Sequence, residues 1–211
     1  MKPPLRYVAL ATLAALQPWL APSAHAQCPD YVRGSTGGDY TNADHRMGLV
    51  VVESYHFTPE VERLIRGKSG PLGADISYTL EHFPNHHRAL TSLAKLALRE
   101  KTNQPVGTRY SIECFFERAM RYQPADAKVR SIYGGYLLSH GRIDGAMEQL
   151  QAAATLQPDD GTAHYNLGLL YVKKKDYTAA LASAHRAYAL GFPLQGLKKQ
   201  LTAAGKWRDA Q

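Results

Sequence analysis

Long runs of like charge are missing from this sequence of 211 residues. Its 25 lysines and arginines are interspersed with 18 aspartates and glutamates, and the longest basic run is Lys173-Lys174-Lys175. Surfaces that bind nucleic acid usually concentrate basic residues in a patch or stripe. The charge pattern therefore argues against nucleic acid as a partner and favours a solvated surface with local basic patches.

Long apolar runs are also scarce, and the one at the start of the chain has a distinct context. The basic start MKPPLR leads into YVALATLAAL and then into the small-x-small pattern Ala24-His25-Ala26. This order is typical of a cleaved signal peptide, and the run is too short to span a bilayer. We expect residues 1–26 to be removed near Ala26, which predicts a periplasmic or secreted protein that does not span the membrane.

The sequence has none of the local motifs that mark common catalytic sites. GSTGG, residues 34–38, lacks the lysine and the strand-helix context of a phosphate-binding loop. Glu53, His56 and Glu60 lie in one stretch without a motif that links them. We therefore predict no enzyme activity and no cofactor, although a site assembled from distant residues would leave no local motif.

Cysteine occurs only twice, as Cys28 and Cys114. In an oxidising compartment such a pair usually forms a disulfide. A bridge between these two residues would tie the segment after the signal peptide to the middle of the chain. The alternative is a buried free thiol at Cys114 and an unattached Cys28.

An internal repeat is the strongest positive signal in the sequence. Residues 124–158 align without a gap with residues 158–192, and four pairs of small or turn residues share an offset of 34 positions: Pro124 and Pro158, Gly134 and Gly168, Ala146 and Ala180, and Ala153 and Ala187. Apolar and small residues in each unit recur at spacings of three and four, which is typical of packed helices. A period of 34 residues is that of a helix-turn-helix repeat.

These residues resemble the tetratricopeptide repeat (TPR) family. Residues 161–193 fit its pattern best, with matches at Leu167, Gly168, Tyr171, Ala180 and Ala187. They depart from it at His164, at Ala184 and at Phe192, where the proline is delayed to Pro193. The resemblance implies an all-α fold, in which helix-turn-helix repeats form a short right-handed superhelical array with a C-terminal capping helix. The ending PLQGLKKQLTAAGKW is similar to that of exported bacterial members of the family.

The repeat pattern divides the chain into four parts. They are the signal peptide (1–26), an N-terminal arm and irregular cap with short helices (27–83), three repeats (84–193) and a C-terminal capping helix and tail (194–211). The first repeat (about 85–124) has an insertion in KTNQPVG, and the others cover 125–158 and 159–193. Within the cap, GLVVVESYHF (48–57) fits a short strand or a buried extended stretch, and TPEVERLIRG (58–67) predicts a short helix.

The segment HFPNHH, residues 82–87, contains three histidines. Its position predicts a junction, with His82 near the end of one helix, His86 in the turn and His87 at the next helix start. We interpret the histidines as partly exposed residues that cap helix ends. The alternative is a periplasmic protein that binds metal or haem through His82, His86 and His87.

TPR arrays usually bind proteins or peptides in a concave groove lined by the first helix of each repeat. In this chain the resemblance places ten residues in that groove: Arg88, Thr91, Lys95, Arg99, Lys128, Ser131, Tyr165, Asn166, Leu169 and Lys173. Five of them are basic and none is acidic, so we expect an acidic or extended peptide segment as the ligand. The chain is thus predicted to be a monomeric, non-catalytic scaffold or adaptor of the cell envelope. The alternative is a solvated basic face that binds nothing.

Overall fold

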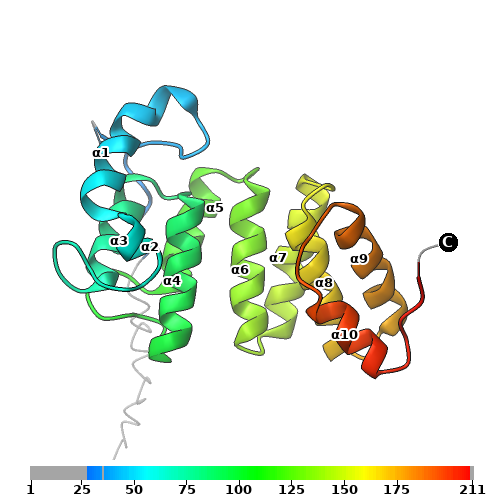
Figure 1. Cartoon of the computed structure of the whole chain (residues 1–211). Helices are drawn as coiled ribbons and strands as arrows, with labels where there is room; N and C mark the ends of the chain where they lie inside the picture. Colours follow the sequence, from blue (N-terminus) through cyan, green and yellow to red (C-terminus); the bar gives the residue numbers. More distant parts are fainter. Residues whose placement is uncertain (1–27, 35, 210–211) are drawn as a thin grey trace, which may run out of the picture.

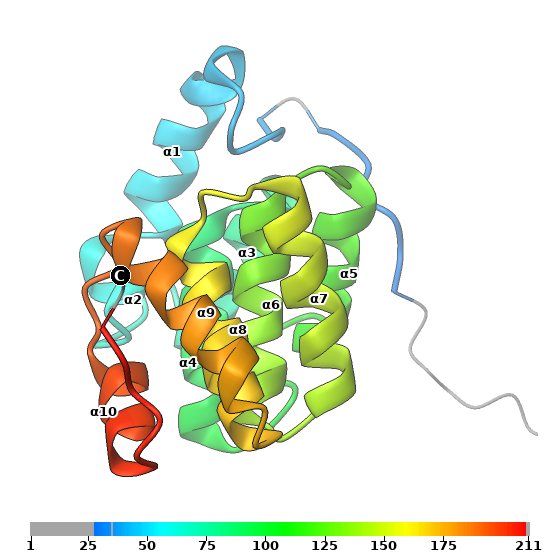
Figure 2. The same cartoon turned by 90° about the vertical axis from the view of Figure 1, so that its right-hand side faces the viewer.

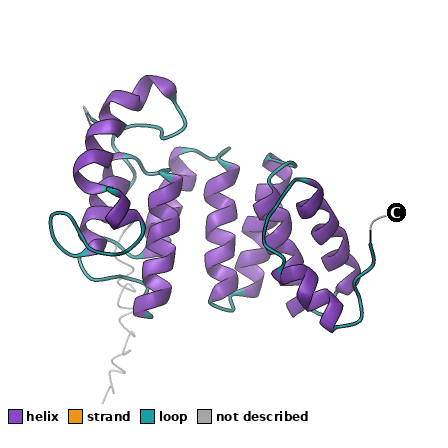
Figure 3. Ribbon diagram, viewed as in Figure 1, coloured by secondary structure: helices purple, strands orange, loops and turns teal. Residues whose placement is uncertain are grey.

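The computed structural model describes residues 28–34 and 36–209, and within them the chain is helical without a strand (Figures 1 and 3). A short 3₁₀ helix, Ala43–His45, precedes the first α-helix. The α-helices are α1 (Arg46–His56), α2 (Pro59–Glu62), α3 (Leu72–His82), α4 (His87–Glu100), α5 (Ile112–Tyr122), α6 (Ala127–Ser139), α7 (Ile143–Leu156), α8 (Gly161–Lys173), α9 (Tyr177–Ala189) and α10 (Gly196–Ala203). None of these helices is long and apolar enough to cross a membrane.

Helices α4 to α9 pack as consecutive antiparallel pairs, α4 with α5, α6 with α7 and α8 with α9 (Figure 1). The first helices of the pairs also contact one another, α4 with α6 and α6 with α8. Helix α10 packs against α8 and α9 at the end of the row, as Figure 2 shows. The predicted all-α repeat array is confirmed, while the residue boundaries of the four parts stay a prediction.

The small residues of the repeat permit close helix packing. A Cβ atom at Gly134 would lie 2.5 Å from Leu150 Cγ in the paired helix α7. A Cβ atom at the equivalent Gly168 would lie 2.3 Å from Leu197 Cδ2 in α10. Both distances are shorter than a normal carbon-carbon contact, so a larger residue at either position would require the neighbouring leucine to move.

Residues 48–57, expected as a strand or an extended stretch, lie within helix α1 and the residue that follows it. Valine is β-branched and favours strands, but tertiary contacts override this preference. Val52 is buried, and the Glu53 carboxylate accepts a hydrogen bond from His86 Nε2 at 2.9 Å. Helix α1 also packs against α3. The helical conformation is therefore set by partners that are distant in the sequence.

The N-terminal arm, residues 28–42, runs along the helix junctions and is covalently attached to them. Cys28 and Cys114 form a disulfide across 86 positions, which confirms the predicted pairing. Next to it, Arg121 donates to the Cys28 carbonyl oxygen at 2.9 Å and to Asp30 Oδ1 at 2.6 Å. The predicted signal peptide, residues 1–26, lies outside the described residues.

Candidate partner-binding groove

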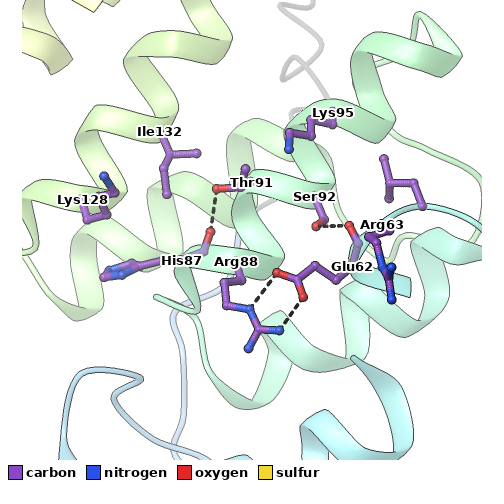
Figure 4. Close-up of a pocket in the computed structure, with 10 residues that line it drawn as sticks. Glu62, Arg63, His87, Arg88, Thr91, Ser92, Lys95, Lys128 and Ile132 are labelled. Atoms are coloured by element: carbon purple, nitrogen blue, oxygen red, sulfur yellow. Dashed lines mark hydrogen bonds and ion pairs between the residues drawn. The ribbon is translucent and has the colours of Figure 1, made fainter. Parts of the chain in front are cut away.

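Two adjoining pockets lie on the face formed by α4, α6 and α8. One, of about 510 Å³, reaches from α2 to α6, and the other, of about 370 Å³, reaches from α4 to α8. Thr91, Lys95, Lys128 and Ile132 line both of them. We call the two pockets together the groove, and Figure 4 shows the first of them.

The N-terminal ends of α4, α6 and α8 are capped in the same way, which aligns the three helices that form this face. His86, Asp126 and Asp160 are the N-caps of α4, α6 and α8, and each side chain accepts a backbone N–H from the first turn of its own helix. Lining residues then recur at helical spacing, as in Thr91, Lys95 and Leu98 on α4. The groove is therefore a direct product of the repeat.

Arg88, at one end of the groove, is already paired. Its guanidinium donates to Glu62 Oε1 at 2.8 Å and to Glu62 Oε2 (Figure 4). It also donates to Glu53 Oε1 at 3.1 Å. The hydrogen bonds that Arg88 donates to Glu62 raise the pKa of Arg88 above its usual range, and the same bonds lower the pKa of the Glu62 carboxyl. Arg88 thus does not offer the unpaired positive charge that its place in the sequence suggested.

The two lysines of the groove differ in their surroundings. Lys128 Nζ lies 3.0 Å from Thr162 Oγ1 and 3.5 Å from Asp160 Oδ1. Lys95 is exposed and makes no hydrogen bond or ion pair to any of the described residues. Lys95 is therefore the cation best placed to meet an incoming carboxylate.

The structure brings together six of the ten residues that were assigned to the groove from sequence: Arg88, Thr91, Lys95, Lys128, Ser131 and Asn166. The other four do not line either pocket. Arg99 donates to the Leu64 carbonyl oxygen at 2.8 Å, and Lys173 donates to the Leu138 carbonyl oxygen at 3.3 Å. Tyr165 is buried against Phe192, with ring centroids 4.4 Å apart, and Leu169 packs against the core.

Several lining residues were not predicted from the sequence. Glu62, Arg63 and Leu64 reach the groove from the N-terminal cap, where no repeat pattern indicated a first helix. Leu64 has a φ angle of 59°, a left-handed conformation that is unusual for a side chain of this size. Leu98, Ile132, Gly135 and Tyr136 lie at helical spacing from predicted groove residues, so extending that spacing would have found them.

HFPNHH forms a helix junction in which each histidine has a separate partner. His82 ends α3 and bonds through Nδ1 to the Tyr78 carbonyl oxygen at 2.9 Å, and His87 Nε2 lies 2.8 Å from Asp126 Oδ2. His86 caps α4, but it is fully buried rather than partly exposed as expected. Among the described residues, no group of three or more histidine, cysteine or acidic side chains is arranged to hold a metal ion. The metal or haem alternative therefore finds no support here.

His86 is held as a neutral ring. Its Nδ1 accepts the Ala89 backbone N–H at 3.1 Å, so Nε2 carries the proton and donates it to Glu53 Oε1. Tyr40 and Phe57 pack against the ring. Burial lowers the pKa of His86 below its usual 6.5, against the opposite effect of the Glu53 hydrogen bond.

The lowered pKa of His86 predicts an acid-sensitive fold. In the unfolded chain this histidine is protonated near pH 6.5, but in the folded chain it is protonated only at lower pH. The stability due to the neutral ring is therefore complete above about pH 6.5 and is lost as the pH falls below that value. His86→Asn keeps an N-cap and removes the titration. Chemical denaturation should show a flatter pH dependence below about pH 6.5 for this variant.

The exposed His140 provides the control for this measurement, because its replacement by asparagine should leave the pH dependence unchanged. An unchanged slope in the His86→Asn variant would show that His86 is not the group responsible. The Asp126 carboxyl, whose pKa is lowered by its hydrogen bond with His87, should still reduce stability as the pH falls below about 4 in both variants. The pKa of Glu53 is lowered mainly by its hydrogen bond with His86, so its contribution should be kept only in the His140 variant.

Comparisons with known proteins agree with the fold. Residues 136–175 match the family model described as TPR repeat. Cell division cycle protein 27 homolog from Caenorhabditis elegans is 28% identical over 125 residues, which make up 53% of this chain but 16% of that protein. The chain thus covers well under two thirds of the relative it matches. The paired helices make the chain an all-helical repeat array, and its residues 136–175 are similar to tetratricopeptide repeats.

Proposed function

We propose that this protein is a non-catalytic scaffold that binds an acidic or extended segment of another protein in the groove between α4, α6 and α8. Tetratricopeptide repeats generally mediate protein-protein interactions, and their curved arrays offer extended concave surfaces. The observation that carries the proposal is the unpaired Lys95 at the centre of the groove, where both pockets meet.

The charges of the groove support an acidic ligand, but through fewer cations than the sequence suggested. Glu62 and Glu53 neutralise Arg88, while Lys128 shares its charge with Asp160. Lys95 is left to form a charge-assisted hydrogen bond with a ligand carboxylate, and Lys128 can add a second. The ligand is therefore held by one or two carboxylates rather than by a long acidic run.

Replacing Lys95 by glutamate is expected to weaken binding of the natural partner at least about tenfold, because an attractive contact becomes a repulsive one. The tagged protein would be crosslinked in its own cells and captured, and the recovered partner quantified by mass spectrometry. Lys199→Glu is the matched control, since Lys199 is an exposed lysine on α10, outside the groove, and its replacement changes the net charge equally. Equal capture of one partner by both variants would contradict the proposal.

We also propose that the protein acts outside the cytoplasm, in the periplasm or after secretion. The apolar run and the Ala24-His25-Ala26 pattern support export, and the disulfide between Cys28 and Cys114 is of the kind that persists in oxidising compartments. The mass of the protein purified from its own cells should correspond to a chain that begins at Gln27. A mass that includes the first 26 residues would contradict export by this route.

A further inference from the structure

The two ends of the groove differ in chemistry. Charged residues line the end near Arg88, where Glu62 pairs with Arg88, and Arg63 donates to the Pro59 carbonyl oxygen at 3.1 Å. The other end is lined by Ala94, Leu98, Ile132 and Tyr136, and we call it the apolar pocket. Leu98 remains 40% exposed, so apolar surface is left uncovered there. An apolar ligand side chain would gain by covering it.

Polar groups without partners also line the apolar pocket. The Ser131 hydroxyl is fully buried, yet it has no hydrogen-bond partner among the described residues. Asn166 lies across from it on α8, and its amide makes no hydrogen bond within the described part of the chain. A buried polar group without a partner costs about 1–3 kcal/mol. The Ser131 hydroxyl is closed off from the groove, whereas the partly exposed Asn166 amide can both donate to and accept from a peptide backbone that lies there.

Gly135 keeps the apolar pocket open. It lies on α6 between Ser131 and Ser139, and a Cβ atom there would come within 3.2 Å of Asn166 Nδ2. Glycine inside a helix costs about 0.5–1 kcal/mol relative to alanine. Gly134 beside it is required for packing against Leu150, whereas Gly135 faces the groove and has no such neighbour in the core. Its lack of a side chain therefore leaves space for a ligand.

Lys95 and Lys128 lie at the boundary between the two ends, because both residues line both pockets. We propose that the groove recognises a two-part peptide motif, a carboxylate next to an apolar side chain. The carboxylate binds Lys95 and Lys128, the apolar side chain enters the pocket of Leu98, Ile132 and Tyr136, and the peptide backbone bonds to the amide of Asn166. This motif rests on the proposed function and narrows its ligand class.

The proposal can be tested with a library of random octapeptides displayed on bacteriophage and selected on the full mature chain. Enriched peptides should carry Asp or Glu within two positions of Leu, Ile, Met or Phe. One such peptide would then be synthesised with its carboxylate changed to the amide, or with its apolar residue changed to serine. Each change should weaken binding about tenfold or more, because each removes one of the two contacts.

Protein variants separate the two parts of the motif. Gly135→Leu fills the apolar pocket, and Leu98→Gln removes part of its exposed apolar wall without adding volume. In both variants, the original peptide should bind no more tightly than the peptide in which serine replaces the apolar residue. It should still bind more tightly than the peptide in which an amide replaces the carboxylate. Gly145→Leu, on α7, is the matched control, because a Cβ atom there makes only an ordinary 3.4 Å contact with Leu137 Cδ1. It should bind as the unaltered protein does.

The outcomes distinguish this inference from the function on which it rests. Enriched peptides that are acidic but show no neighbouring apolar preference would overturn the two-part motif and leave the peptide-binding groove in place. The two-part motif would also be overturned if the ratio of the affinities for the apolar and the serine peptide were the same in Leu98→Gln as in the unaltered protein. A selection that enriches nothing, from a protein that is folded by circular dichroism, would overturn both proposals.

Discussion

Replacing Cys28 and Cys114 together by serine is expected to lower the free energy of unfolding by about 2–5 kcal/mol. The disulfide closes a loop between positions 86 residues apart, and a loop of this length places a large entropic restriction on the unfolded chain. The melting temperature should fall by roughly 5–15 °C for a domain of this size. Thermal unfolding of the oxidised protein and of the double variant measures the difference.

Arg121→Ala is the control for the disulfide. Arg121 binds the same part of the arm, through Asp30 and the Cys28 carbonyl oxygen, but its ion pair is partly exposed and should contribute about 1 kcal/mol or less. A double serine variant that melts within about 2 °C of the unaltered protein would show that the bridge does not restrain the unfolded chain, because its loop-closure effect alone corresponds to a larger shift.

Replacing Asn85 by alanine is expected to cost about 2–4 kcal/mol and to release the N-terminal arm. Asn85 is fully buried, and its amide nitrogen donates to Asp39 Oδ1 at 2.7 Å and to Asp126 Oδ2 at 3.0 Å. Its amide oxygen accepts the Tyr40 backbone N–H at 3.0 Å. Alanine would leave that N–H unpaired and would remove the donors that hold two carboxylates near one another.

Two measurements check the role of Asn85. Chemical denaturation gives the change in stability, and hydrogen exchange should show faster exchange of the arm from Gly38 to Thr41 while α6 to α9 stay protected. The pKa values of Asp39 and Asp126, which the Asn85 hydrogen bonds help to lower against the effect of burial, should both rise. Asn103→Ala, in an exposed loop, is the control. A loss below about 0.5 kcal/mol with an unchanged arm would contradict this account.

The repeat could be predicted from the sequence because its signals are local. The matched positions Gly134 and Gly168 and the N-caps Asp126 and Asp160 lie at a fixed offset, and each reflects a requirement of one helix or of two helices adjacent in the chain. Local signals of this kind can be detected in a single sequence. The helix pairs and the capping helix α10 therefore agree with expectation.

The features that could not be predicted depend on residues far apart in the chain. Helix α1 is helical despite three consecutive valines, because Glu53 bonds to His86, Val52 is buried and the helix packs against α3. Arg88 has the position of a groove cation, but Glu62 reaches it from 26 positions earlier and neutralises it. The burial of His86 likewise follows from Tyr40 and Phe57, which no repeat pattern relates to it.

Helix α1 presents an exposed apolar surface outside the groove. Its exposed side carries large apolar residues at helical spacing, namely Met47, Val50, Val51 and Tyr55. In Figures 1 and 2 this helix extends beyond the row formed by α4 to α9. A contact there would leave the groove unused, so the two surfaces have to be compared directly.

The most direct test of the groove is a photocrosslinking amino acid placed at Thr91, which lines both pockets, and in a second protein at Val50, which is 61% exposed on α1. Both proteins would be irradiated in their own cells, and the crosslinked products identified by mass spectrometry. The account predicts a crosslinked partner protein from Thr91 that is lost when Lys95→Glu is added. A partner crosslinked from Val50 and not from Thr91 would contradict it.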